Sequence, residues 1–289
     1  MAVEMEPRFI GEFQTGLDCP KSLAFDRAGD LYAGCCGWNG GARKFTRNGG
    51  VFTPSWTLPF KKVMGIAEGK DGNICMSRKE GECHEVRVVS PHGELLKTWG
   101  SLGVGHGQFS TPAGVAVDGA GCVYVVEASS WPFVAHDGGA KAGGMRVQKF
   151  DADGNFLRAW GAYGFWEGEF NVPVGIAVDK KNCVYVADTH NCRVQKFDCG
   201  GAFIRAWGTC GAKDGQMNCP QGIAIHPAGD VFVADTLNNR VQRFTPNGEW
   251  VASMGSEKDF WLPCGIAFDR DGTMAVADTM NNRIRILKT

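Results

Sequence analysis

The stretch VYVADTHNCRVQKF at residues 184–197 decides the fold of this chain. Apolar residues alternate on both sides of a short polar segment, which is the pattern of two β-strands joined by a loop. Nearly the same stretch returns as VFVADTLNNRVQRF at 231–244 and as MAVADTMNNRIRIL at 274–287. A stretch that recurs within one chain predicts a repeat architecture.

Each repeat opens with GIAVD or a variant of it, and the spacings between successive openings are 43, 49, 61, 47 and 43 residues. The glycine of this opening, or the residue that replaces it, is Ser22, Gly65, Gly114, Gly175, Gly222 and Gly265. Every unit contains four short apolar runs separated by Gly, Asp and Asn turns, which predicts four antiparallel strands. We name these strands A to D in chain order. One such sheet cannot bury both of its faces, whereas six sheets packed around an axis can, so the sequence predicts an all-β, six-bladed propeller.

The two ends of the chain predict how the ring closes. The last repeat stops after its third strand, and the run FIGEFQTG at 9–16 matches the missing fourth strand. We therefore expect residues 9–14 to complete the last blade, so that residues 1–289 form a single propeller domain.

The consensus P-x-GIAVD…VYVADT-x-NNRVQ-x-F resembles the NHL repeat, with three close copies and three degraded ones spread over nearly the whole chain. The resemblance implies the same six-bladed propeller. It implies no single function, because similar propellers bind RNA or protein in the TRIM-NHL proteins and act as lyases in the peptidylglycine amidating enzyme and in streptogramin lyase.

Composition narrows the classes of partner. Thirty basic and 31 acidic side chains give a net charge of -1, which argues against nucleic acid as a partner because no global positive field is present. No run approaches the roughly 18 apolar residues of a membrane span, and the first residues lack the apolar core of a signal peptide. We therefore expect a monomer in the cytoplasm, with its 12 cysteines reduced.

The repeated charged residues are interpreted as structural. Asp188 precedes Arg193 by five residues across the loop between strands B and C, and blades 5 and 6 repeat this spacing. Blade 2 carries Arg78 and Glu85 at the corresponding places, so the pair exists there with its charges exchanged. An exchanged pair keeps its attraction but loses any specific acid chemistry. If the pair is exposed, it contributes only about 0 to 1 kcal/mol.

One large apolar residue recurs on strand D of each blade, and we expect these residues to pack between neighbouring blades. They are Phe13, Trp56, Trp99, Trp160, Trp207 and Met254. Likewise, DADG at 151–154 and DRDG at 269–272 lack the later Glu of a calcium loop and are predicted to be hairpin turns.

Departures from the repeat are the best indicator of a functional site. We call the face that carries the B–C loops and the connections from strand D to the next blade the upper face. Blades 4 to 6 keep a short B–C loop, whereas blades 1 to 3 replace it with CCGWNGGA at 35–42, RKEGECHE at 78–85 and an 18-residue insertion between Glu127 and Arg146. A tolerated surface insertion is the alternative interpretation.

Aromatic anchors beside a few polar groups are typical of a recognition site, so we expect blades 1 to 3 to bind a protein, a peptide or a small ligand. The candidate ligand-binding residues are Lys21, Trp38, Lys62, Trp131, Phe133, His136, Asp137, Lys141 and Trp166.

Catalysis is left open. A lyase or hydrolase acting in the central mouth is the alternative function, and it could depend on a metal, zinc or calcium. The candidate metal ligands are Cys35, Cys83, His84, His136 and His190. The resemblance to the peptidylglycine lyase implies histidines at the inner mouth, but the corresponding positions here are Lys21, Met64, Ala113, Val174, Gln221 and Cys264. No catalytic residue and no certain cofactor is predicted.

Overall fold

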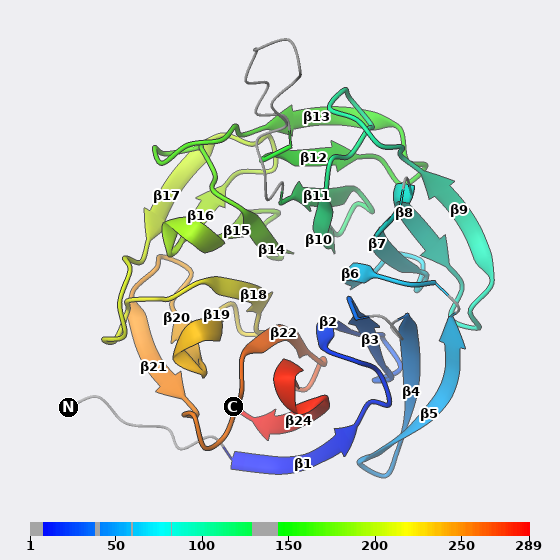
Figure 1. Ribbon diagram of the computed structural model, residues 1–289, viewed down its shortest axis with the longest axis vertical. Helices are drawn as coiled ribbons and strands as arrows, with labels where there is room; N and C mark the ends of the chain where they lie inside the picture. Colours follow the sequence, from blue (N-terminus) through cyan, green and yellow to red (C-terminus); the bar gives the residue numbers. More distant parts are fainter. Residues whose placement is uncertain (1–7, 38–40, 59, 82, 129–143) are drawn as a thin grey trace.

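The computed structural model describes residues 8–37, 41–58, 60–81, 83–128 and 144–289. Six four-stranded antiparallel sheets surround a central axis, which is the predicted six-bladed propeller (Figure 1). Strand A of each blade lies next to the axis and strand D lies at the rim.

The four positions within a blade are filled in regular order. The A strands are β2 (Pro20–Phe25), β6 (Val63–Glu68), β10 (Pro112–Val117), β14 (Pro173–Val178), β18 (Pro220–Ile225) and β22 (Pro263–Phe268). The B strands are β3 (Leu31–Cys35), β7 (Ile74–Glu80), β11 (Val123–Glu127), β15 (Val184–Asp188), β19 (Val231–Asp235) and β23 (Thr273–Asp278). The C strands are β4 (Ala42–Asn48), β8 (Cys83–Val89), β12 (Val147–Phe150), β16 (Arg193–Phe197), β20 (Arg240–Phe244) and β24 (Arg283–Lys288). The D strands are β5 (Val51–Leu58), β9 (Leu95–Trp99), β13 (Phe156–Trp160), β17 (Phe203–Trp207), β21 (Trp250–Met254) and β1 (Arg8–Gln14).

Strand β1 closes the ring, as the sequence predicts. It pairs antiparallel with β24, in a register that runs from Arg8 opposite Lys288 to Gln14 opposite Arg283. Phe13 then reaches across to blade 1, where its ring centroid lies 4.8 Å from that of Phe45. The two ends of the chain are thus joined within one sheet.

The glycine of GIAVD is needed because the A strands approach one another closely around the axis. A Cβ atom on Gly222 would lie only 1.9 Å from the carbonyl oxygen of Cys264 in the next blade. Blade 1 has Ser22 at this position, and the adjacent strand compensates with Gly34, where a Cβ would lie 2.5 Å from Ser22 Oγ. In blade 1 the glycine therefore lies on strand B instead of strand A, and the two positions together occupy a similar volume.

The strand D aromatics pack between blades, as expected. Trp160 of blade 3 covers the C–D turn of blade 4, where a Cβ on Gly201 would lie 2.5 Å from the indole ring. Trp207 and Gly248 repeat this arrangement one blade further on. Glycine is therefore required at this turn for two reasons: its φ is positive, and a side chain would collide with the neighbouring indole.

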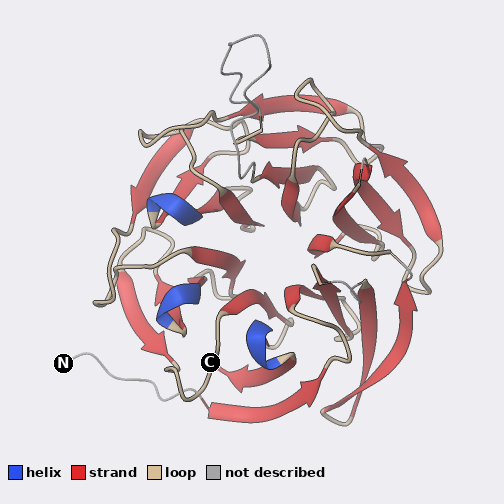
Figure 2. Ribbon diagram, in the orientation of Figure 1, coloured by secondary structure: helices blue, strands red, loops and turns tan. Residues whose placement is uncertain are grey.

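Three short 3-10 helices occupy the B–C loops of blades 4, 5 and 6 and lie on one face of the ring (Figure 2). They are η1 (Thr189–Asn191), η2 (Thr236–Asn238) and η3 (Thr279–Asn281). No helix in the described part of the chain is long and apolar enough to cross a bilayer.

Candidate functional site

The B–C loops of blades 4, 5 and 6 each contain the same hydrogen-bonded network around a buried Asp. In blade 5, the carboxylate of Asp235 accepts hydrogen bonds from the Asn218 backbone N–H at 2.7 Å and from the Asn238 amide at 2.9 Å. It also accepts from Arg240 Nε at 2.8 Å and from the Gln242 amide at 3.0 Å. The equivalent carboxylates in blades 4 and 6 are Asp188 and Asp278.

The ion pair is buried, so the small energy of an exposed pair does not apply to it. The Asp235 side chain is fully buried and that of Arg240 is only 12% exposed, because the connection from blade 4 covers them. Arg240 also donates hydrogen bonds to the carbonyl oxygens of Lys213 and Gln216 in that connection. The pair therefore belongs to a buried network that fixes the loop, and loss of one partner is costly in such a network.

Blade 2 confirms the exchanged pair. Arg78 donates to Glu85 at 2.9 Å, and its Nε donates to the carbonyl oxygen of Lys61 in the preceding connection. The Arg78 guanidinium thus donates to a backbone carbonyl of the connection. In blades 4 to 6, the buried carboxylate instead accepts a hydrogen bond from a backbone N–H of the connection. The β7–β8 hairpin continues to the pair Glu80 and Cys83, and the described residues of this loop form no 3-10 helix.

Blade 3 keeps its buried acid despite the insertion. Glu127 is fully buried, lies 2.7 Å from Arg146 Nε and accepts a hydrogen bond from the Ser110 N–H at 2.8 Å. The insertion therefore leaves the base of the loop intact. Five of the proposed ligand-binding residues fall within the insertion and lie outside the described residues: Trp131, Phe133, His136, Asp137 and Lys141.

In blade 1, the loop carries a buried thiol. Cys35 ends β3, its Sγ donates to the carbonyl oxygen of Asp18, and Sγ accepts a hydrogen bond from the Gly37 N–H. Burial raises the pKa of Cys35 to about 11. The free thiol is therefore protonated at neutral pH. Trp38, in the same loop, lies outside the described residues.

The upper mouth of the channel is narrow. Its cavity is about 80 Å³ and is lined by Lys21, Met64, Val174, Gln221 and Cys264, among others. The Sγ of Cys264 lies 3.5 Å from the Gln221 side-chain oxygen, and burial raises the pKa of this thiol. Further in, the lining is a ring of aliphatic side chains, Leu23, Ile66, Val115, Ile176, Ile223 and Ile266. The mouth can hold a small group, but it is too small for a drug-sized molecule.

A larger hollow, which the sequence interpretation missed, lies at the lower mouth. It measures about 490 Å³, and its lining includes Asp26, Asp179, His226 and Asp269, each of which directly follows an A strand. Asp179 accepts hydrogen bonds from the Tyr185 hydroxyl and from two backbone N–H groups of its own turn. The Asp that recurs in GIAVD is the sequence feature that could have indicated this lower hollow. These carboxylates hold the A–B turns, so they are already committed to structure.

Two further candidates lie on separate parts of the upper face. The Trp166 side chain is 79% exposed, and its carbonyl oxygen accepts a hydrogen bond from Arg193 of blade 4. Lys62 lies at the entry to blade 2, where its carbonyl oxygen accepts from the Lys79 N–H at 3.2 Å. The structure thus places Trp166 beside the regular loop of blade 4, and its assignment to the binding site stays a prediction.

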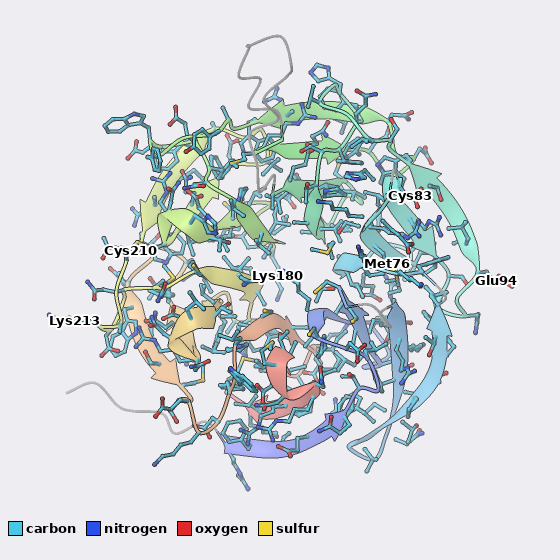
Figure 3. The ribbon with its side chains drawn as sticks, viewed as in Figure 1. Met76, Cys83, Glu94, Lys180, Cys210 and Lys213 are labelled. Atoms are coloured by element: carbon cyan, nitrogen blue, oxygen red, sulfur yellow. A yellow bond between two sulfur atoms is a disulfide. The ribbon has the colours of Figure 1, made fainter. Side chains whose placement is uncertain are left out.

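The candidate metal ligands are dispersed. Cys83 is exposed on blade 2, His84 is buried on the same strand and His190 is exposed on blade 4 (Figure 3 shows Cys83). His136 lies outside the described residues. Within the part of the chain that the structure describes, no three His, Cys, Asp or Glu side chains are grouped so that they could hold an ion.

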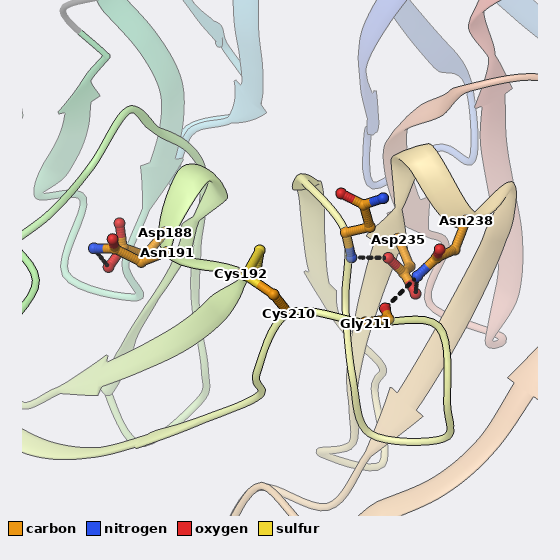
Figure 4. Close-up of a disulfide and its surroundings, with 8 residues drawn as sticks. Asp188, Asn191, Cys192, Cys210, Gly211, Asp235 and Asn238 are labelled. Atoms are coloured by element: carbon orange, nitrogen blue, oxygen red, sulfur yellow. Dashed lines mark hydrogen bonds between the residues drawn. A yellow bond between two sulfur atoms is a disulfide. The ribbon is translucent and has the colours of Figure 1, made fainter.

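The expectation that all cysteines are reduced is wrong for one pair. Cys192, at the end of η1, forms a disulfide with Cys210 in the connection from blade 4 to blade 5 (Figure 4). Asn239 and Asn282 take the place of Cys192 in blades 5 and 6. Their side-chain oxygens accept 2.8 Å hydrogen bonds from the N–H groups of Leu262 and Cys19, at the entry to the next blade. A covalent link has therefore replaced a hydrogen bond in blade 4.

This replacement predicts a measurable redox effect. The Cys210→Ser variant should lose about 3 kcal/mol of unfolding free energy, the chain-entropy estimate for a loop of this length. Adding Cys192→Asn should restore about 1 kcal/mol by recreating the hydrogen bond of blades 5 and 6. Urea unfolding with and without dithiothreitol measures both effects. Reductant should destabilise the natural chain but neither variant. If reductant leaves the stability of the natural chain unchanged, the disulfide is wrong.

Comparison with known proteins agrees with this fold. Residues 170–197 and 217–244 match the family model described as NHL repeat. The solved structure titled "Streptogramin B lyase structure" is similar over 98% of this chain and 98% of that chain, with 15% identity and a TM-score of 0.64. A protein of unknown function from Bacteroides caccae is similar over 88% of each chain, with 14% identity and a TM-score of 0.62. No curated protein matched. The chain is a six-bladed β-propeller, and two of its segments match the NHL repeat.

Proposed function

We propose that this propeller is a binding protein that takes a protein, a peptide or a small-molecule ligand on the upper face of blades 1 to 3. The observation that carries the proposal is the asymmetry of the ring. Blades 4 to 6 repeat one compact loop around a buried Asp, whereas blades 2 and 3 keep a buried ion pair but differ from the repeat in the sequence of the rest of the loop. A loop that keeps its foundation and varies its exposed part is typical of a recognition surface on a rigid scaffold.

The contact residues remain those that the sequence indicates. The loops of blades 1 and 3 supply Trp38, Trp131, Phe133, His136, Asp137 and Lys141, Lys21 and Lys62 supply positive charge at the mouth, and Trp166 supplies an exposed aromatic ring. We further propose a monomer that acts in the cytoplasm and does not bind nucleic acid.

The test replaces Trp131, Phe133 and His136 together with alanine. Capture of partners from the source cell, followed by direct titration with the captured ligand, should show at least a tenfold loss of affinity, because aromatic anchors dominate binding energy. The matched control replaces two exposed apolar residues of the regular loops, Leu237 and Met280, and should bind normally. Both variants should unfold at the same temperature as the natural chain. Equal binding by the triple variant would overturn the site.

A lyase or hydrolase is the second candidate, supported by the fold shared with the streptogramin B lyase structure. The mouth of this chain offers Lys21, Gln221 and the Cys264 thiol, whose raised pKa keeps it neutral and weakly nucleophilic at pH 7. Zinc or calcium would have to supply the missing electrophile. A stoichiometric metal in purified protein that is lost on replacing Cys83, His84 and His136 would favour this candidate over the first.

A further inference from the structure

Three exposed aromatic side chains lie in the connection between blades 3 and 4. Tyr163 is 47% exposed, Phe165 62% and Trp166 79%, and the ring centroids of Tyr163 and Phe165 lie 5.8 Å apart. Single exposed apolar residues are ordinary on a protein surface, whereas a group of them indicates a contact surface. We call residues 162–170 the aromatic loop.

The backbone of the aromatic loop is held in place by hydrogen bonds. The Glu169 carboxylate accepts from the N–H groups of Phe165 and Trp166, at 3.0 and 3.1 Å. Arg193 of blade 4 donates to the carbonyl oxygens of the same two residues. A surface that is already ordered pays less conformational entropy on binding, so the fixed backbone favours recognition.

The equivalent loop of the next blade shows that the rings are not needed for the fold. The isolated bridge that joins the two sides of the aromatic loop recurs in the connections into blades 3 and 5. In the connection into blade 5, Ala212 and Lys213 take the places of Phe165 and Trp166 (Lys213 is labelled in Figure 3). The Lys213 N–H donates at 3.1 Å to the glutamine three residues later, and its carbonyl oxygen accepts from Arg240 at 2.8 Å. Trp166 makes the same two backbone hydrogen bonds, so the indole itself has no structural role.

The aromatic loop also carries net negative charge. It contains Glu167 and Glu169 but no Lys or Arg, and Glu167 is exposed. The nearby Arg193 is already engaged in the buried ion pair of blade 4. By contrast, the equivalent loop into blade 3 contains no acidic residue, and the loop into blade 5 balances one lysine with one aspartate. Carboxylates beside exposed aromatic faces suit a cation, which the quadrupole of the ring also attracts.

We propose that the aromatic loop is a contact point for a protein partner that presents an arginine or lysine side chain. This inference rests on the proposed binding function and selects a protein among the ligands considered there. A small molecule needs a concave site, whereas these side chains are exposed on the surface of a loop, which suits the extended surface of a protein. Tryptophan, tyrosine and arginine supply most of the binding energy in protein interfaces, and the indole is the best aromatic partner for a cation.

Short synthetic peptides test the charge of the partner. The probes are acetylated and amidated Gly-Arg-Gly-Arg-Gly and the same peptide with Gln or Glu in place of Arg. Each is titrated into the full chain at one ionic strength, and the indole N–H resonance of Trp166, assigned by its absence in Trp166→Ala, is followed by NMR. We expect a saturable shift with the arginine peptide, whose dissociation constant should be about two- to fivefold below that of the glutamine peptide. The glutamate peptide should bind most weakly.

Three variants make the test specific. Phe165→Ala should weaken binding of the arginine peptide about two- to fivefold, because one ring is lost. Glu167→Gln should reduce the preference for arginine over glutamine. The matched control is Trp261→Ala, which removes an exposed aromatic side chain from the connection into blade 6 and should bind as the natural chain does. All three variants should unfold at the temperature of the natural chain.

Equal shifts with all three peptides, or no shift with any, would overturn the cation-binding role of the aromatic loop. A Trp166 resonance that shifts with protein concentration alone would assign the loop to a second copy of this chain, which would also overturn the proposal. Either result, combined with lost binding in the variant of Trp131, Phe133 and His136, would leave the binding function standing with a ligand that does not use the aromatic loop.

Discussion

Deletion of residues 1–14 should abolish cooperative folding. The deletion removes β1, and with it the β24 ladder and the contacts of two phenylalanines. The Cζ atom of Arg285 lies 3.4 Å from the ring centroid of Phe9. Phe13 packs on Phe45 and Phe52 of blade 1. Each phenylalanine contributes up to about 3 kcal/mol and each ladder hydrogen bond about 1 kcal/mol. The total approaches the stability of about 5 to 15 kcal/mol expected for a whole domain.

Thermal unfolding followed by circular dichroism measures this effect. Deletion of residues 1–7 alone is the control, since it stops before β1 and should leave the melting temperature unchanged. A synthetic peptide of residues 8–16 added to the longer deletion should restore a cooperative transition by supplying the missing strand. If the protein that lacks residues 1–14 melts as the natural chain does, the role of β1 in closing the ring is wrong.

Replacement of Asp235 with alanine should cost about 3 to 5 kcal/mol of unfolding free energy. The substitution leaves the Arg240 guanidinium, only 12% exposed, without its buried counter-ion, and the Asn218 N–H without an acceptor. Urea denaturation, with the free energy extrapolated to water, gives the value directly.

Asp214 provides a matched control on the same arginine. Its carboxylate lies 3.8 Å from Arg240 Nη1, but its side chain is 59% exposed. Asp214→Ala should therefore cost less than about 1 kcal/mol, as surface ion pairs do. Equal costs for the two substitutions would show that the buried network contributes no more than the surface pair.

The architecture could be predicted because each blade repeats the same physical solution. The alternation around VYVAD, the glycine of GIAVD and the single strand D aromatic each mark one structural requirement, and Arg78 with Glu85 shows that the ion pair survives exchange of its charges. Burial of that pair could not be predicted, because the cover comes from the connection of the preceding blade, and only the folded ring shows that this connection lies over the pair.

The site was harder to predict because its residues meet only across blades. Cys192 takes the place of an asparagine, but nothing in the sequence says that the next connection brings Cys210 to it. The sequence places Lys79 and His84 in an altered loop, whereas their shared face and the nearby Thr111 appear only when β7, β8 and the entry to blade 3 are in place. The distances between residues of different strands and blades are set by the packing of the folded chain.

The pairing of β1 with β24 also has a consequence for biosynthesis. Arg8 must wait for Lys288 before it finds its partner, and translation at about 5 to 20 residues per second makes this wait roughly 14 to 56 s. During that time five blades can assemble while the first strand remains an unprotected edge on the ribosome-bound chain. Synthesis of β24 therefore triggers the last folding step, and nascent chains stalled before residue 283 should depend on chaperones to keep that edge from aggregating.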